Sequence, residues 1–330
     1  MSKSDSLSSA ADRATGRAAG QGYGDLGVLP GDGAHDRKSG HERLSAPVQL
    51  LRPEGGATRR RSRGPGQRGL SELAHNLRER DWTVLGLVAE HRFLTTRHIE
   101  RFCFHDHASV ASGARVARRV LARLERDRLL QRPFRRIGGL LAGSAASVWM
   151  LTSVGQRLLA MRAGRGAVGR VRAPGQRFVD HYLAIADTRL QLVEAERAQQ
   201  LVVPEVQVEP RAWRSYLGLH GSAVQLKPDL FAITATDSTA EYEDHWFIEV
   251  DRATESIPTL LRQCRAYEQY RRSGQEDTEY GVFPRVIWIV PHDHRARRLL
   301  EAITSARELD PALFTVTVPS GLLSILREPP

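Results

Sequence analysis

The segment Trp246–Asp251 constrains the fold more than any other, because it sets two acids in an otherwise apolar run. Side chains of a β-strand alternate between its two faces, so a strand here places Glu249 and Asp251 on the same face as Phe247. The other face is entirely apolar. The sequence therefore predicts a strand within a sheet, from which two carboxylates project side by side.

An earlier segment, 225–234, is predicted to be a neighbouring strand and carries Lys227 and Asp229 two residues apart. If the two strands pair, Asp229 converges on the other two acids. Like charges at about 4 Å repel by roughly 4 kcal/mol at an effective dielectric of about 20, so such a cluster needs a cation or a shared proton. We expect a divalent metal, and ligands that are all oxygen favour Mg²⁺ or Mn²⁺ over zinc.

These residues resemble the PD-(D/E)xK nuclease superfamily, in which a Pro-Asp on one strand and a Glu-x-Lys on the next surround a metal on a small mixed sheet. Pro228-Asp229 and Glu249 match, and the later Gln263-x-x-x-Tyr267 resembles the Gln-x-x-x-Tyr motif of RecB-type exonucleases. The resemblance implies catalytic roles for six residues, which are Lys227, Asp229, Glu249, Asp251, Gln263 and Tyr267.

The chain departs from this pattern at Asp251, which stands where the superfamily has lysine. A nuclease needs a cation within reach of the scissile phosphate, and an acid cannot supply it. Lys227 is the predicted replacement, since a strand that stays regular through Pro228 sets it on the same face as Asp229. Arg262 is the competing cation. The structural alternative is that Lys227 is a solvated residue at the mouth of its strand.

A helix predicted over 178–198 carries His181 in its first turn. In RecB-type nucleases a histidine of the first core helix joins the metal ligands, so the resemblance implies a metal set of His181, Asp229 and Glu249. An ordinary core or surface histidine is the alternative. The remaining patterns predict an α/β fold with a mixed sheet flanked by helices, with strands over 201–208, 213–219, 286–290 and 314–318 and a closing helix over 295–306.

The N-terminal half is predicted to begin with three helices. Two strands separated by a glycine-containing turn follow them, as in a winged helix-turn-helix, and Thr152 or Ser153 begins a further helix. The predicted helices span residues 71–90, 97–102, about 112–126 and about 153–162, and the strands span 129–136 and 147–151.

Nine arginines and two acids lie between Arg115 and Arg136, a density too high for an ordinary solvated helix. We expect this module to bind DNA, with most arginines meeting phosphates. The alternative is a winged helix that binds another protein and whose arginines are simply exposed to solvent. The candidate DNA-binding residues are Arg115, Arg118, Arg119, Arg123, Arg126, Arg135 and Arg136.

Both halves together resemble the replication-relaxation family, which plasmids and other mobile elements encode, over about residues 70–318. Net charge is +11 over 71–175 and −6 over 176–330, as expected if one domain holds a polyanion and the other gathers carboxylates for metal. We predict a disordered Arg/Gly/Ser-rich tail over 1–69, a winged-helix domain over 70–162, a flexible linker over 163–176 and a nuclease-like domain over 177–330.

Other function classes lack their motifs. The sequence has no phosphate-binding Gly-x-x-x-x-Gly-Lys-Ser/Thr loop and no pair of histidines flanking a hydrophobic residue, as HUH relaxases require. No apolar run approaches a membrane span, so we expect a cytoplasmic protein.

Two functions therefore remain open. The first is a metal-dependent DNA endonuclease or nickase that its winged helix delivers to DNA. The second is a DNA-binding factor of plasmid replication, mobilisation or transcription whose nuclease fold does not turn over. DNA is the expected partner of both, and a second copy of the chain or another replication or mobilisation protein is a further candidate.

Overall fold

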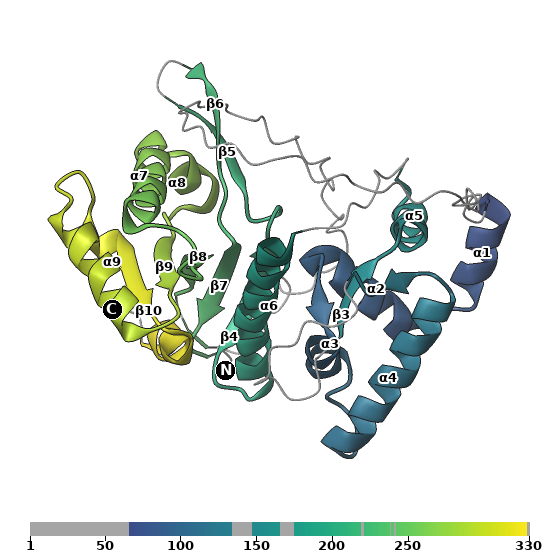
Figure 1. Cartoon of the computed structure of the whole chain (residues 1–330). Coiled ribbons are helices and arrows are strands. Elements are labelled where there is room, and N and C mark those ends of the chain that lie inside the picture. The colour runs from purple at the N-terminus through teal and green to yellow at the C-terminus, as the bar shows by residue number, and fades with distance from the viewer. Residues whose placement is uncertain are drawn as a thin grey trace, which may run out of the picture.

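The computed structural model describes residues 66–133, 147–165, 175–218, 221–237, 239–240 and 242–328. These residues form helices around a three-stranded sheet and a five-stranded sheet, with a separate two-stranded hairpin (Figure 1). No helix among them is both apolar enough and long enough to cross a bilayer.

Two helices, α1 (Gln67–His75) and α2 (Glu79–His91), replace the single helix predicted over 71–90. The break falls at Arg78, whose backbone N–H donates to the Asp81 carboxylate at 2.8 Å. A side chain that caps a free backbone group in this way begins a new helix.

The next two helices begin where polar residues cap them. Thr95 accepts a hydrogen bond from the backbone of α3 (Thr96–Cys103), and Ser109 does the same for α4 (Val110–Arg126). Three strands, β1 (Leu94–Thr95), β2 (Leu130–Gln131) and β3 (Val148–Leu151), form an antiparallel sheet in the order β1-β3-β2.

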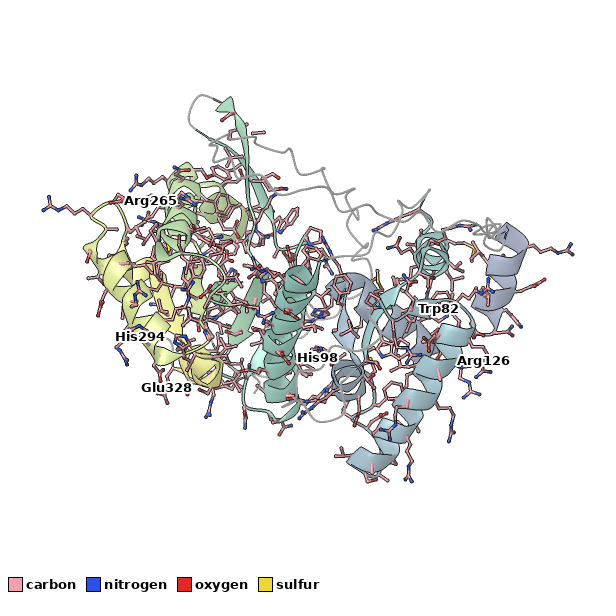
Figure 2. All side chains as sticks on the ribbon, in the orientation of Figure 1. Trp82, His98, Arg126, Arg265, His294 and Glu328 are labelled. Carbon is pink, nitrogen blue, oxygen red and sulfur yellow. The ribbon has the colours of Figure 1, made fainter. Side chains whose placement is uncertain are left out.

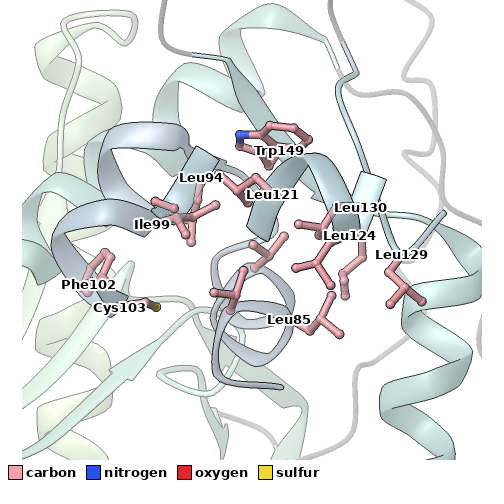
Figure 3. Close-up of a cluster of buried hydrophobic side chains, with 14 of the residues drawn as sticks. Leu85, Leu94, Ile99, Phe102, Cys103, Leu121, Leu124, Leu129, Leu130 and Trp149 are labelled. Atoms are coloured by element: carbon pink, nitrogen blue, oxygen red, sulfur yellow. The ribbon is translucent and has the colours of Figure 1, made fainter. Parts of the chain in front are cut away.

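The fourth predicted helix is α5 (Ser153–Arg162), which Thr152 caps. Of the strand predicted over 129–136, only Leu130 and Gln131 are strand in the described residues, and the predicted turn lies outside them. Figure 3 shows the apolar side chains that these helices and strands bury between them.

The C-terminal half is built on a mixed five-stranded sheet in the order β10-β9-β8-β7-β4. Strands β7, β8 and β4 pair antiparallel, whereas β9 and β10 run parallel to β8. The predicted α/β class is thereby confirmed. The strands are β4 (Val202–Val208), β7 (Leu230–Ala235), β8 (Asp244–Val250), β9 (Arg285–Ile289) and β10 (Phe314–Thr317).

Helices cover both faces of this sheet, and the predicted alternation along β8 is confirmed. Phe247 packs in the cluster that α7 and α9 cover, whereas Trp246 and Ile248 pack in the cluster that α6 and α10 cover. The helical segments are α6 (Gln176–Arg197), α7 (Ile257–Ser273), α8 (Gln275–Tyr280), α9 (Asp293–Ser305), α10 (Leu322–Arg327) and two short 3-10 turns, Pro311–Leu313 and Pro319–Gly321.

A β-hairpin of β5 (Arg214–Leu217) and β6 (Ala223–Leu226) stands apart from the main sheet (Figure 1). The strand predicted over 225–234 is therefore wrong as one unit, because it is divided between β6 and β7. Lys227-Pro228-Asp229 forms the break. Proline lacks the N–H that a continuous ladder requires, so the chain leaves one sheet there and enters the other.

Helix α6 lies between the N-terminal helices and the main sheet (Figure 1) and packs side chains into the cores of both. Its residues Ala186 and Leu190 pack in the N-terminal cluster, whereas Ile185 and Leu192 pack against the sheet.

Polar contacts join α6 to α3 of the N-terminal half. His98 lies against it (Figure 2), with Nε2 2.8 Å from an oxygen of Asp187. The Arg101 Nε donates to Glu194 at 2.7 Å, and Arg197 donates to two backbone carbonyls of α3, each at 2.7 Å. The two halves of the chain therefore share a packed interface.

Candidate metal centre and nucleic-acid interface

Three potential metal ligands converge where the main sheet meets α6. One ligand atom from each of His181, Glu209 and Asp229 lies within 4.8 Å of the other two. The His181 Nε2 is 3.1 Å from Asp229 Oδ1 and 4.0 Å from Glu209 Oε1. Two carboxylates and an imidazole this close together are a set of donors that suits a divalent metal.

Backbone pairing brings these residues together. Glu209 follows β4 directly, and its N–H donates to the Asp229 carbonyl at 3.0 Å, which extends the pairing of β4 with β7. The Asp229 carboxylate accepts a hydrogen bond from the Val250 N–H at 2.8 Å, at the end of β8. His181 reaches the same point from the first turns of α6. The two acids therefore lie at strand ends, Glu209 directly after β4 and Asp229 directly before β7, where hydrogen bonds to the sheet backbone hold them.

Glu249 lies buried beside this group. The Tyr267 hydroxyl, from α7, donates to Glu249 Oε1 at 2.5 Å. Burial, followed by the nearby charge of Asp229, raises the pKa of Glu249 well above its usual value. The same causes raise the pKa of Glu209. Acids that resist ionisation in this way are those that a bound cation would stabilise.

The pKa of His181 is shifted upward although burial lowers it. Its hydrogen bond to Asp229 and the charges of Asp229 and Glu209 outweigh the burial. The negative charge of the two acids therefore favours the protonated form of His181, and it would favour a metal cation at the same place for the same reason.

Asp251 does not join the cluster, and the prediction that it converges with Asp229 and Glu249 is corrected. Its carboxylate forms an ion pair with Arg295 of α9, whose Nη2 is 2.9 Å from Asp251 Oδ1. It lies one residue beyond the end of β8, in the segment that leads to α7. The position that carries lysine in the motif therefore holds an acid that is paired with an arginine.

The other residues implied by the resemblance are dispersed. Lys227 is exposed, with its Nζ 4.8 Å from the ring centre of Trp213, so its predicted place beside Asp229 is wrong. The broken strand turns it away. The Gln263 amide is 3.3 Å from the Glu255 carboxylate near the start of α7. Of Lys227, Gln263 and Tyr267, only Tyr267 hydrogen-bonds an acid next to the cluster, which is Glu249.

Glu209 is the residue that sequence reasoning missed. The strand predicted over 201–208 ends directly before it, and the available signal was an acid at the end of a strand next to the predicted Asp229 strand. That signal gains meaning only when β4 and β7 are known to pair.

The arginines of α4 fall into two groups. Four of them, Arg115, Arg118, Arg119 and Arg126, are exposed, and Arg126 points away from the rest of the molecule in Figure 2. Arg123 instead forms an ion pair with the buried Asp81, so its prediction as a DNA contact is corrected. Arg135 and Arg136 lie outside the described residues.

The structure thus defines an α/β protein that joins an arginine-bearing helical half to a mixed sheet with a buried cluster of acids. A family model described as replication-relaxation matches residues 85–286, which include β8, α7 and the acid cluster. This match spans more than half of the chain, which therefore belongs to the replication-relaxation family. Searches of curated proteins and of solved structures found no match.

Proposed function

We propose that this protein binds DNA through its N-terminal half and cuts or nicks it at a divalent metal held by the acid cluster. Membership of the replication-relaxation family indicates a role in replication or relaxation of a plasmid or other mobile element. The observation that carries the nuclease proposal is the convergence of His181, Glu209 and Asp229 beside the buried Glu249.

The donors present fit Mn²⁺ or Mg²⁺. Asp229 and Glu209 would supply carboxylate oxygens, and His181 would supply a nitrogen that favours Mn²⁺ of the two. Glu249 stands next to them in the same negative field. The metal would provide Lewis-acid stabilisation of charge on a phosphate.

The protein's own residues hold this site in place. The Val250 N–H fixes one oxygen of Asp229, which leaves the other toward His181. Tyr267 orients Glu249 from the opposite side of the strand pair. Hydrogen bonds of this kind set ligand direction and basicity.

The N-terminal half supports DNA binding by its order of elements and its charge. Helices α2, α3 and α4 followed by β2 and β3 are the arrangement expected of a winged helix-turn-helix. Four exposed arginines on α4 offer guanidinium groups to phosphates.

A DNA-binding protein without turnover is the second candidate. The ion pair of Asp251 with Arg295 favours it, because the motif position expected to supply a cation supplies none. In that case the acid cluster would serve structure or metal binding alone.

Incubation of the full chain with supercoiled, linear and single-stranded DNA separates the two candidates. Cleavage in Mn²⁺ or Mg²⁺ that a chelator stops, and that Asp229→Asn abolishes, supports the nuclease. Asp237→Asn is the matched control, because Asp237 is an exposed acid just past the opposite end of β7. If the wild type binds DNA and leaves all three substrates intact with either metal, the second candidate stands.

A further inference from the structure

The acid cluster needs a cation that none of the expected residues supplies. Asp251 is bound to Arg295, and Lys227 lies over Trp213. Arg262 is exposed on α7, and its guanidinium donates to the Thr259 hydroxyl at 3.1 Å. A phosphate approaching three or four acids requires positive charge from elsewhere.

Arg92 lies near the cluster although it comes from the N-terminal half. Its guanidinium carbon is 4.9 Å from the ring centre of Tyr182 and 6.0 Å from that of Phe178, both on α6. Tyr182 is the neighbour of His181, and its hydroxyl hydrogen-bonds Glu209. The charge of Arg92 lowers the pKa of Glu209, against the larger effect of burial, which places the guanidinium within electrostatic reach of the cluster.

This guanidinium forms no ion pair with any carboxylate of the described residues. Its guanidinium carbon lies over the ring of Tyr182. An arginine held over an aromatic ring in this way can still donate its N–H groups to phosphate oxygens in pairs.

The backbone at Arg92 is held in a conformation that arginine rarely adopts. Its φ is 62° and its ψ is −43°, and the Phe93 N–H donates across it to the His91 carbonyl at 2.6 Å. This is a strained γ-turn, which glycine would form more easily. Both flanking residues are buried, His91 against Phe102 and Phe93 against Tyr182, so the turn aims Arg92 at α6. Strain that the surroundings maintain in this way is typical of functional positions.

We propose that Arg92 binds the phosphate of a DNA strand at the acid cluster, so that the N-terminal half contributes a residue to the site of the C-terminal half. The inference rests on the proposed DNA-processing function for the identity of its ligand. Arg92 thus takes the part that lysine plays in the motif, and the shared helix α6 fixes its distance from the metal ligands.

Binding of tetrathymidylate to the full chain tests this assignment. Titrations are run without metal and with Ca²⁺, and Mn²⁺ affinity is measured separately by calorimetry. Arg92→Gly should bind the oligonucleotide at least about tenfold more weakly than wild type, and Arg92→Lys should restore part of the loss. Mn²⁺ affinity should not fall in either variant, because Arg92 is not a ligand.

Arg128→Gly is the matched control. Arg128 also lies in the N-terminal half with a positive φ of 58°, and it is exposed, so this change removes one arginine and relieves one turn away from the cluster. It should leave binding near the wild-type value. Near-ultraviolet circular dichroism and melting temperature verify that each variant is folded.

The outcomes separate this proposal from the nuclease proposal. Undiminished oligonucleotide binding by Arg92→Gly, an equal loss in Arg128→Gly, or no binding by the wild type overturns the role of Arg92. If Mn²⁺ binds but the Arg92 variants bind the oligonucleotide as wild type does, the metal centre is supported and the role of Arg92 is rejected. An Arg92 effect without Mn²⁺ binding leaves a phosphate site and removes the metal centre.

Discussion

Glu209 stands in the metal-ligand cluster where the sequence pointed to Glu249. We expect Glu209→Gln to lower Mn²⁺ affinity by roughly tenfold or more, since it removes a charged donor from the group around His181 and Asp229. Isothermal titration calorimetry measures this. Glu205→Gln is the control, because Glu205 lies on β4, which Glu209 follows, and its carboxylate accepts a hydrogen bond from Gln207 instead. Equal affinity in both variants would remove Glu209 from the ligand set.

The raised pKa of Glu249 predicts how stability depends on pH. Between the unfolded pKa, about 4.3, and the higher folded pKa, the folded state binds more protons than the unfolded state. Stability contributed by protonated Glu249 is therefore present at low pH and is lost as pH rises through this window.

Glu249→Gln cannot ionise, so it should avoid that loss. In chelator at about pH 7.5, the variant should melt about 2–4 °C above wild type, the shift that roughly 1 kcal/mol gives in a chain of this size. The difference should shrink near pH 5 and reverse in saturating Mn²⁺, because the metal stabilises only the wild-type carboxylate. Differential scanning calorimetry across these conditions is the measurement. A constant difference at all pH values would show that Glu249 does not titrate in the window.

At the level of elements, α4 carries both the proposed DNA contacts and a structural ion pair. Its four exposed arginines, Arg115, Arg118, Arg119 and Arg126, should each release about one counterion. Changing all four to alanine should weaken DNA binding and make the slope of log K against log salt shallower by about 3 to 4, at about −0.9 per contact. Fluorescence anisotropy over a salt series measures the slope. An unchanged slope would place the DNA contacts elsewhere.

Arg123→Ala should behave differently from these four. It leaves the buried Asp81 without its partner, so stability should fall by about 1–3 kcal/mol, discounted for the partial exposure of the arginine. The salt slope of DNA binding should stay near the wild-type value. Urea unfolding gives the stability change. A variant that is as stable as wild type but has a shallower salt slope would show that Arg123 contacts DNA.

The sequence predicted the elements better than it predicted their breaks. The alternation along β8, the mixed sheet and the helix α6 follow from residue periodicity, which is local. The break at Pro228 and the cap at Arg78 each depend on one residue within a longer apolar pattern, which periodicity averages away. Asp229 and Glu249 lie within electrostatic reach of each other because neighbouring strands carry them, but the group of converging ligand atoms contains Glu209 in place of Glu249. Glu209 and Arg295 act through pairings between segments that the sequence leaves unspecified.

At the scale of the whole molecule, α6 contributes buried side chains to the cores of both halves. Leu190 packs in the N-terminal core and Leu192 packs on the sheet, and both are buried. Leu→Ala at either position creates a cavity that costs about 2–5 kcal/mol. If the halves unfold together, each variant should lower a single shared melting temperature.

The transition is followed by tryptophan fluorescence and by far-ultraviolet circular dichroism. Tryptophans lie in both cores, for example Trp149 in the N-terminal one and Trp288 in the C-terminal one. Coincident curves for both probes in both variants are expected. Two separate transitions, with Leu190→Ala shifting one and Leu192→Ala the other, would show that the halves fold independently.

Sharing α6 also limits how such a gene can be rearranged. A crossover before Gly175 would separate the N-terminal helices from Ala186 and Leu190, which complete their core, whereas a crossover after Arg197 would strip Ile185 and Leu192 from the sheet. Neither junction leaves two intact parts. The protein can therefore exchange its N-terminal half with a relative only if the incoming half fits the helix already present, so the two halves are expected to be inherited together.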